Sequence, residues 1–552
     1  MIVSPQHLFV LPIVLPLVAA AFLLLFGERL RRFGAFLNIG FSAAGLAVAV
    51  EIARWASTAS SPHPVGVYLA ANWEAPFGIV LVVDRLSALM LVLTGVVSLG
   101  SAVYASAGWS RAGVYFHPLF QIQLMGLNGA FLTGDLFNLF VFFEVMLAAS
   151  YGLQLHGSGW PRVRTGLHYI AVNLLASSLF LVGLAVLYGV TGTLSMADVA
   201  ARVALVPAVD HGLLHAGAAI LAVAFLIKAA IWPLNSWLVP AYAAATPPVA
   251  SLFALMTKVG VYALLRLSTL IFSADAGVSA RFGAPVLLYG GIATIVFGTI
   301  GLVASLRLGR IAGFSIIVSA GTLLATIGFA DVALTSAALF YLVSATLAAS
   351  ALFLLVELVG RRDGDREPAP APEPEEGSLV DEDTNLDDEQ APLVGRAVPV
   401  SLALLGLAFI ACALVIAGLP PLSGFVAKLG LLSALVQPRG AAAENAAAGW
   451  TVFGLLLLSG LVATVALART GIQHFWAGIA RPPARLKVAE GLPVLGLVLA
   501  CTWLTLDAEA VLRFTTATSE ALYAPKAYID AVMSAKPVPG PTRPTIEAED
   551  AP

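Results

Sequence analysis

The segment Phe225-Leu-Ile-Lys-Ala-Ala-Ile-Trp-Pro233 decides how this chain folds, because it sets a lysine and a proline inside a long apolar run. A second run, Gly418-Leu-Pro-Pro-Leu-Ser-Gly-Phe-Val-Ala-Lys428, combines the same two features. Proline removes a helical hydrogen bond and leaves the carbonyl four residues earlier free. Free carbonyls inside a membrane are tolerated only where protein groups or water satisfy them. The two segments therefore predict interrupted helices that carry lysines at membrane depth.

The rest of the chain has the composition of a membrane protein. Hydrophobic residues make up 59% of its 552 residues and charged residues only 11%, against roughly 25% charged in soluble domains. Apolar runs of about 20 residues, long enough to cross a bilayer, recur along the sequence. We predict an all-α polytopic membrane protein with about fourteen transmembrane helices, which start near positions 8, 35, 77, 113, 134, 166, 212, 247, 284, 309, 333, 397, 448 and 489.

The first apolar run, Leu8 to Phe26, is too long for the core of a signal peptide and is expected to remain as the first membrane helix. Among the loops that follow, arginines are concentrated in every second one. Loops on the cytoplasmic side of a membrane are typically enriched in arginine and lysine. The predicted outward loops between spans hold only Arg54, Arg202, Arg281 and Arg439. This alternation predicts a multi-pass protein of a bacterial cytoplasmic membrane with both termini outside.

The acidic residues are unevenly distributed. Residues 361–390 hold twelve of the 32 acidic residues and three of the 29 basic ones, which leaves 20 acidic and 26 basic residues elsewhere. This composition predicts that 361–392 is a disordered cytoplasmic linker. Beyond the last span, Thr515 to Ala535 is expected to form an amphipathic helix. The predicted segments are 1–112, 113–273, 284–470, 471–514 and 515–552.

Three of the six lysines, Lys228, Lys258 and Lys428, lie in apolar runs. A lysine at mid-membrane costs about 2.5–3.5 kcal/mol, so it normally faces a partner or a water-filled cavity; snorkelling to the interface is the alternative. Glu144 is the acidic residue placed well inside an apolar span. We expect Glu144 to form an ion pair with Lys228, because an isolated charge there would be costly.

Three further polar residues are weaker candidates. Asp84 and Asp135 lie near predicted helix starts, where a capping or surface role is the favoured interpretation. His168 could relay protons, as histidines often do, but a structural role explains it equally well.

Cys412 and Cys501 each lie in an apolar run, so the sequence offers no disulfide framework and no metal or cofactor site. No basic cluster is interleaved with aromatic residues, which argues against nucleic acid as a partner. Proton and cation transfer is the chemistry that remains.

Several segments carry a family resemblance. They are Gly134-Asp-Leu-Phe-Asn-Leu-Phe-Val-Phe-Phe-Glu144, Phe225-Leu-Ile-Lys-Ala-Ala230, Ala250-Ser-Leu-Phe-Ala-Leu-Met-Thr-Lys-Val-Gly-Val-Tyr-Ala-Leu-Leu-Arg266 and Gly418-Leu-Pro-Pro-Leu-Ser-Gly-Phe425. The chain resembles the antiporter-like subunits shared by Mrp antiporters, respiratory complex I and membrane-bound hydrogenases. Two more segments, Gly129–Asp135 and Ala521–Val532, are similar to the D subunits of Mrp antiporters rather than to those of complex I.

The resemblance implies two inverted five-helix repeats, spans four to eight and nine to thirteen, with spans seven and twelve broken. By position, Glu144 and Lys228 match the family's ion pair, and Lys258 and Lys428 match its relay lysines. Ser344 stands where relatives often carry a histidine, and Ala349 where many complex I homologues carry a lysine. A relay between the halves would then depend on water near Ser344.

The leading hypothesis is a membrane component of a Na⁺ or K⁺/proton antiporter, not an enzyme, which works with the A subunit of the Mrp complex and its small membrane subunits in membrane lipid. The alternative is a proton-pumping module of a redox complex. A silent scaffold is disfavoured, because it has no reason to bear the insertion cost of three lysines.

Overall fold

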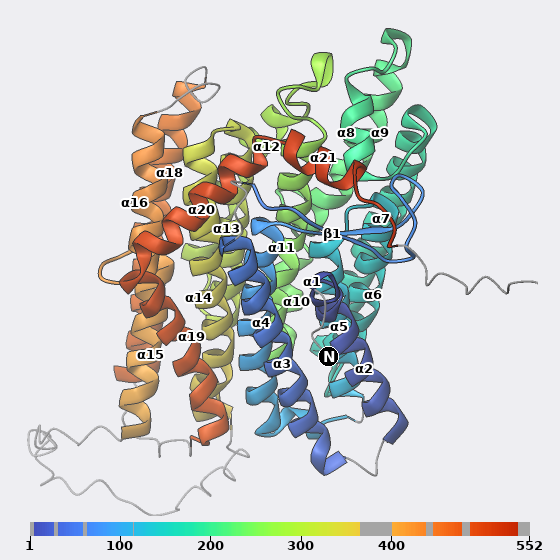
Figure 1. The fold of residues 1–552 in the computed structure, drawn as a ribbon. Helices are drawn as coiled ribbons and strands as arrows, with labels where there is room; N and C mark the ends of the chain where they lie inside the picture. The colour runs from blue at the N-terminus through green and yellow to red at the C-terminus, as the bar shows by residue number, and fades with distance from the viewer. Residues whose placement is uncertain are drawn as a thin grey trace, which may run out of the picture.

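The structure, a computed structural model, describes residues 5–26, 31–58, 63–113, 115–364, 400–437, 445–476 and 486–538. Its long helices stand side by side as a bundle (Figure 1). They are α2 (Leu11–Phe26), α3 (Arg31–Thr58), α4 (Arg85–Ser106), α5 (Phe116–Leu132), α6 (Leu136–Gln154), α7 (Trp160–Thr191), α9 (His211–Lys228), α11 (Pro247–Leu270), α12 (Ala284–Ala304), α13 (Leu308–Phe329), α14 (Val332–Gly364), α15 (Val400–Ala417), α16 (Ser423–Val436), α18 (Ala446–Gly471) and α19 (Val488–Leu506).

Short elements connect these helices or lie on the ends of the bundle. They are α1 (Pro5–Leu8), β1 (Gly66–Leu69), β2 (Val80–Val83), η2 (Trp109–Arg111), α8 (Met196–Val203), η3 (Ala208–Asp210), α10 (Leu238–Ala244), η4 (Gly277–Ser279), the π-helix η5 (Ile472–Trp476), α20 (Ala508–Leu522) and α21 (Lys526–Met533).

The mostly helical membrane fold expected from the sequence is present. In the described part of the chain, twelve helices are long and apolar enough to cross a membrane, and α2 and α16 are shorter apolar helices. A helix begins close to each predicted start except the one near 77; α5, of 17 residues, is the helix near position 113, and α16 begins at no predicted start. The number of these helices that cross the membrane, the inverted repeats and the segment boundaries stay predictions.

The third predicted span, near position 77, begins later than expected. Its first residues form β2, which pairs antiparallel with β1 so that Gly66 faces Val83 and Leu69 faces Val80. The β-branched run Val80-Leu-Val-Val83 suits a strand, so the helix begins only at Arg85. A small β hairpin is thus added to the helical bundle.

The bundle has two distinct ends. α21 contacts both β1 and α8 at one end, which we call the hairpin face. The opposite end, where α14 stops at Gly364 and α15 starts at Val400, is the linker face. α14 is helical through Gly364, so the predicted disordered linker does not begin at Arg361. The rest of that predicted linker, from 365 to 392, lies outside the described residues.

The centre of the bundle consists of α11, α13 and α14. The apolar windows of α11 and α13 are entirely buried within the protein, and that of α14 is 89% buried. α11 packs against both α13 and α14. α11, the helix that carries Lys258, is therefore shielded from lipid by the rest of the protein, as a helix with a buried lysine requires.

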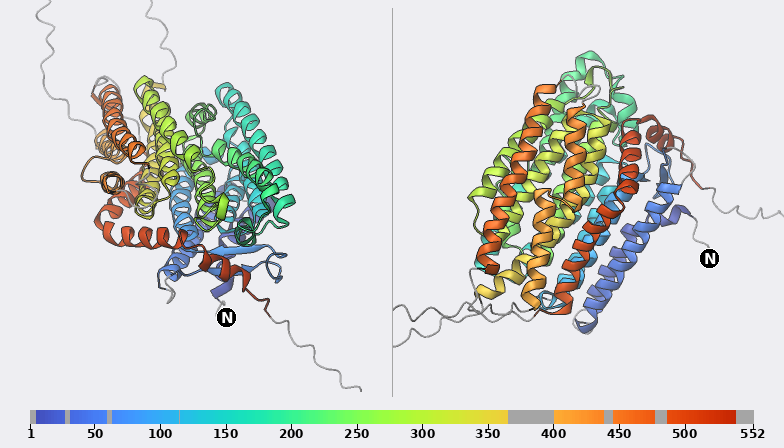
Figure 2. Two further views of the ribbon diagram at one scale, coloured as in Figure 1. Left: turned by 90° about the horizontal axis from the view of Figure 1, so that it is seen from above. Right: turned by 90° about the vertical axis from the view of Figure 1, so that its left-hand side faces the viewer.

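The C-terminal part crosses the hairpin face as two helices, α20 and α21, rather than as the single predicted helix from Thr515 to Ala535. Seen from above in Figure 2, they run along one edge of the bundle. α20 packs along α14, and α21 reaches α8 and β1. Pro525 follows the break after Leu522, where a helix cannot continue unkinked. We call α20 and α21 together the C-terminal arm.

Candidate functional site

The first interruption follows Lys228, where α9 ends. The amide of Ala229 still bonds to the Phe225 carbonyl at 2.8 Å, but Ala230 takes a left-handed φ of +58°. The amide of Ile231 then reaches back to the Leu226 carbonyl at 3.1 Å, and the next helix, α10, starts at Leu238. The proline-associated break expected here is present, and it places Lys228 at the open end of a helix.

A close helix contact stabilises this break. A Cβ atom on Gly260 of α11 would lie 2.6 Å from the Ala229 nitrogen and 3.0 Å from the carbonyl carbon of Lys228. Only glycine allows α11 to approach the interrupted backbone this closely. Because Gly260 follows Lys258 by two residues, the same contact brings the helix of Lys258 against the end of α9.

Lys228 is 5% exposed and binds an amide rather than the expected carboxylate. Its Nζ donates to Asn173 Oδ1 at 2.9 Å, and Asn173 is held by its own bond to the Tyr169 carbonyl. Lys228 and Glu144, both among the described residues, form no direct ion pair, so the predicted pair is wrong for this conformation. Oε1 of Glu144 lacks a hydrogen-bond partner within the described part of the chain.

Lys258 is 1% exposed and donates from Nζ to Ser319 Oγ of α13 at 2.8 Å. Ser319 and Tyr341 of α14 line the same cavity. The structure thus links the relay lysine predicted in the first half to hydroxyl groups of the second half.

The second interruption repeats the backbone pattern of the first. α15 ends at Ala417, Gly418 has a φ of +79°, and the amide of Leu419 reaches back five residues to the Leu414 carbonyl at 2.9 Å. Lys428, on α16, donates from Nζ to the Ala417 carbonyl at 2.7 Å. A carbonyl freed by Pro421 is therefore satisfied by the lysine itself.

A polar cavity lies between these two lysine sites. It has about 20 Å³ of room for the centre of a water molecule, enough for roughly one water. Polar groups from four helices line it, namely Ser315, Ser319, Tyr341, Ser344, Lys428 and Ser459. Ser319 touches Lys258 on one side, and Lys428 lines the other side. The cavity thus joins Lys258 to Lys428 through hydroxyl groups.

Ser344 lies on α14, next to the first residue of α16. Its hydroxyl lies 2.8 Å from that of Ser423, the first residue of α16, and both side chains are buried. Ser344 also lines the cavity beside Lys428. The structure therefore puts it next to a space of water size, as the interpretation of a water-dependent link requires.

The weaker candidates lie away from this line. Asp135 caps α6 by accepting from the Asn138 amide at 2.8 Å, and its burial raises the pKa of its carboxyl despite that bond. His168 is exposed and contacts Ser236 at 3.5 Å. The structure brings neither residue to the lysines.

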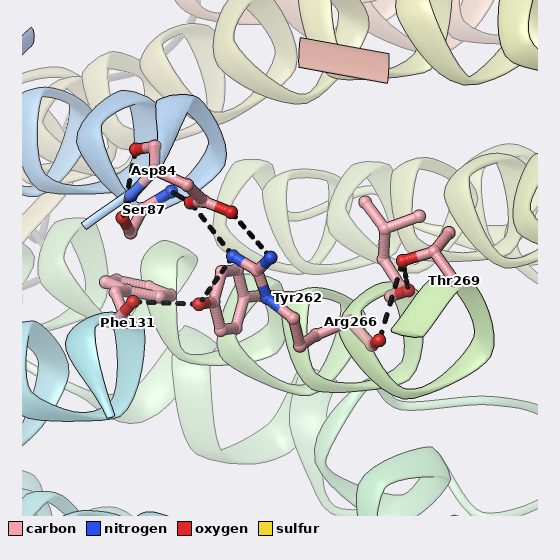
Figure 3. Close-up of polar contacts among 7 residues, drawn as sticks. Asp84, Ser87, Phe131, Tyr262, Arg266 and Thr269 are labelled. Atoms are coloured by element: carbon pink, nitrogen blue, oxygen red, sulfur yellow. Dashed lines mark hydrogen bonds and ion pairs between the residues drawn. The ribbon is translucent and has the colours of Figure 1, made fainter. Parts of the chain in front are cut away.

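Asp84 caps α4 through Ser87, as the favoured interpretation expected, but it also forms a buried ion pair (Figure 3). Arg266 of α11 donates to both carboxylate oxygens, at 2.6 and 2.9 Å. Burial alone would raise the pKa of Asp84, but the charge and hydrogen bonds of Arg266 outweigh it and hold that pKa below its usual range. The guanidinium is covered by the ring of Tyr528 from the C-terminal arm, 5.3 Å away.

Another charged cluster, near the linker face, was not predicted. Glu357 of α14 accepts from the Tyr104 hydroxyl at 2.8 Å and from Trp109 Nε1 at 2.7 Å. Arg361 bonds to Glu357 and reaches Glu490 at 2.8 Å. In sequence these residues stand near the ends of apolar runs, where charges are ordinary, so only the packing reveals the cluster.

Comparison with known proteins agrees with this architecture. The family pattern described as "NADH:quinone oxidoreductase/Mrp antiporter, TM" matches residues 133–454, more than half of the chain. The chain is 50% identical over 534 residues to the D subunit of a "Probable K(+)/H(+) antiporter" of Rhizobium meliloti, covering 96% of this chain and 98% of that protein. It is 32% identical over 537 residues to the D subunit of the "Na(+)/H(+) antiporter" of Alkalihalophilus pseudofirmus, covering 96% and 99%.

A solved structure has the same fold. A chain of the Mrp complex from Dietzia sp. DQ12-45-1b superposes with a TM-score of 0.79 at 27% identity, covering 96% of this chain and 100% of that one. These likenesses support a membrane component of a cation/proton antiporter. The chain therefore belongs to the NADH:quinone oxidoreductase/Mrp antiporter family, in which its similarity is to the D subunits of Mrp-type antiporters.

Proposed function

We propose that this chain is the D subunit of a monovalent cation/proton antiporter and that it carries protons along Glu144, Lys228, Lys258 and Lys428. The observation that carries this proposal is the contact of Lys258 with Ser319 at the edge of the cavity that Lys428 also lines. It supports one polar line from the first interrupted helix to the second.

The partners of the lysines suit proton transfer. Lys228, Lys258 and Lys428 donate to an amide oxygen, a hydroxyl and a backbone carbonyl, none of which carries a charge. A buried ammonium with only neutral partners gives up its proton more readily than one held in an ion pair. Hydroxyl groups and water can both accept and donate, so Ser319 and a water molecule in the cavity can pass the proton on.

Glu144 has a modulating role in this scheme. It makes no ion pair with Lys228 in this structure, and a movement of α6 relative to α9 that brought the two side chains together would form one. Forming and breaking that pair would alternately hold and release the proton of Lys228. Glu144 thus sets when the first relay group is loaded.

The rest of the assignment follows the same family likeness. We propose that the chain works beside the A subunit of the Mrp complex and its small membrane subunits, in the lipid of a bacterial cytoplasmic membrane, with both termini outside. The relatives are named for exchange of K⁺ or Na⁺ for protons, and these two cations are the candidates here. The same polar line would also serve a proton-pumping component of a redox complex, because the matching family includes NADH:quinone oxidoreductase subunits.

The decisive experiment measures cation-driven loss of a proton gradient. Everted vesicles from an antiporter-deficient host would contain the whole complex with wild-type chain, Lys228→Ala, Glu144→Ala or the control Lys526→Ala. Lys526 is exposed on the C-terminal arm and lies on no part of the relay. We expect Na⁺ or K⁺ to collapse the gradient with wild type and Lys526→Ala, and not with the two relay variants, at equal assembly.

Two results would contradict the proposal. If assembled wild-type complex fails to respond to either cation, the redox-module function is favoured. If Lys228→Ala exchanges cations normally, protons do not pass through Lys228.

A further inference from the structure

A second buried polar site lies away from the lysines, among α2, α3, α4 and α5. Figure 1 shows these N-terminal helices as neighbours, and α3 and α5 each pack against the other three. Their shared cavity has about 20 Å³ of room for the centre of a water molecule. We call it the N-terminal pocket, and the residues of its wall used below are Pro12, Ser42, Gly45, Thr94, Gln121 and Asn128.

A proline opens the backbone of α2 at this pocket. Pro16 lies inside the helix and cannot donate to the carbonyl of Pro12. The Asn128 side chain of α5 donates to that carbonyl at 2.8 Å instead. A carbonyl oxygen has two lone pairs, so one remains available. The same device, a backbone carbonyl freed by proline, occurs at the second lysine site.

Two amide groups near the N-terminal pocket already donate to protein oxygens. Gln121 Nε2 donates to Asn38 Oδ1 at 2.7 Å and to Ser42 Oγ at 3.2 Å. Asn128 gives its amide hydrogen to Pro12, and Ser98 donates to the Gly95 carbonyl. The residues that line the pocket still offer side-chain oxygens, namely those of Ser42, Thr94 and Gln121.

Two of these oxygens lack any partner in the described part of the chain. They are Oε1 of Gln121 and Oγ1 of Thr94, whose side chains are only 1% and 2% exposed. A buried polar atom without a hydrogen bond costs free energy, about 1–3 kcal/mol each. Such groups at membrane depth commonly mark an ion or substrate site. Two in one small cavity therefore point to a ligand.

We propose that the N-terminal pocket binds one dehydrated monovalent cation, Na⁺ or K⁺, through neutral oxygens. Carbonyl, amide and hydroxyl oxygens can replace the hydration shell of such an ion. None of the described residues that line the pocket is charged, so a divalent ion would be poorly compensated. The inference rests on the proposed antiport function, and it gives the exchanged cation a site separate from the lysine relay.

The structure offers variants that change the pocket with little other effect. Thr94→Val keeps the shape and removes a hydroxyl that has no partner among the described residues, so a merely structural role predicts no loss. Gly45→Val adds a side chain where a Cβ meets nothing within 4 Å, on a residue that lines the pocket. Gly40→Val is the matched control, because it lies on the same helix with equal space but outside the pocket.

Equilibrium binding of ²²Na⁺ and ⁸⁶Rb⁺ to the purified complex, with choline holding the ionic strength constant, tests the inference. We expect saturable binding by wild type, Gly40→Val and Thr94→Ser. Thr94→Val and Gly45→Val should weaken one class of site by about tenfold or more, equivalent to about 1.4 kcal/mol. Lys228→Ala should keep the binding while losing exchange.

Equal binding by wild type and both pocket variants would overturn the inference, as would the absence of saturable binding, which would leave water as the only occupant. Either result leaves the proposed antiport intact if vesicle exchange persists. Failure of exchange in wild type, by contrast, refutes the antiport proposal whatever the binding result.

Discussion

Ser319→Ala isolates the link between the two halves of the chain. It removes the hydroxyl that accepts the Lys258 hydrogen bond at 2.8 Å and that borders the cavity of Lys428. Hydrogen bonds to charged groups are worth about 1.5–3 kcal/mol. If the proton crosses here, a loss of that size in the rate-limiting step slows exchange by about ten- to a hundredfold.

The structure supplies a close control for this variant. Ser315 lies one turn away on α13 and lines the same cavity, but its hydroxyl bonds to the Ala312 carbonyl of its own helix at 2.7 Å. Ser315→Ala removes the same atoms and leaves the contact of Lys258 unchanged. We expect it to alter exchange by no more than about twofold.

Initial rates of cation-driven dequenching in everted vesicles, normalised to assembled complex, provide the comparison. The reasoning fails if Ser319→Ala exchanges at the wild-type rate, because the proton would then not pass this hydroxyl. It also fails if both serine variants lose the same activity, since the cavity as a whole, rather than the Lys258 contact, would be responsible.

Three further predictions concern stability and the helix breaks. Gly260→Ala should destabilise the protein by about 1–3 kcal/mol, because its Cβ would meet the backbone of Ala229, whereas Gly189→Ala, with nothing within 4 Å, should be neutral or stabilising in a thermal-unfolding assay. Asp84→Asn should lower the free energy of unfolding by about 3–5 kcal/mol at neutral pH, because it breaks a buried ion pair. The folded protein lowers the pKa of Asp84, so the ion pair stabilises the protein fully above about pH 4 and less as the pH falls through the pKa of the folded state. The free energies of unfolding of wild type and variant should therefore converge in acid. Gly418→Ala should abolish exchange, since its Cβ would overlap the Lys428 side chain in a left-handed conformation, and wild-type rates in that variant would show that the break is not needed.

The sequence predicted the features that leave a local trace. Lys228 and Lys428 lie near prolines within apolar runs, so both the helix breaks and the buried charges could be inferred from the local sequence. The capping roles of Asp84 and Asp135 were visible for the same reason, because an N-cap is read from the residue and its immediate successors.

The partners of these residues could not be inferred in this way. Asn173 is 55 positions from Lys228, and Ser319 is 61 positions from Lys258, so only the packing of helices brings them together. The expected ion pair between Glu144 and Lys228 is absent from this conformation because Lys228 donates instead to the amide of Asn173, which is held by its own helix. The ion pair between Asp84 and Arg266 was not predicted, because the two residues are 182 positions apart and neither local sequence indicates the other.

The C-terminal arm has a consequence for how the protein is made. Its first helix bonds to the start of α14 through Ser519 and Thr516, and its second places Tyr528 over Arg266. The ribosome synthesises these residues after every bundle helix. Until the arm is made, its contacts with α14 and Arg266 are missing, so we expect a newly inserted bundle to be more accessible to quality-control proteases. We expect nascent chains stalled after α19 to be digested faster than complete ones. In that case synthesis of the C-terminal arm is the step that makes the folded protein resistant to proteases.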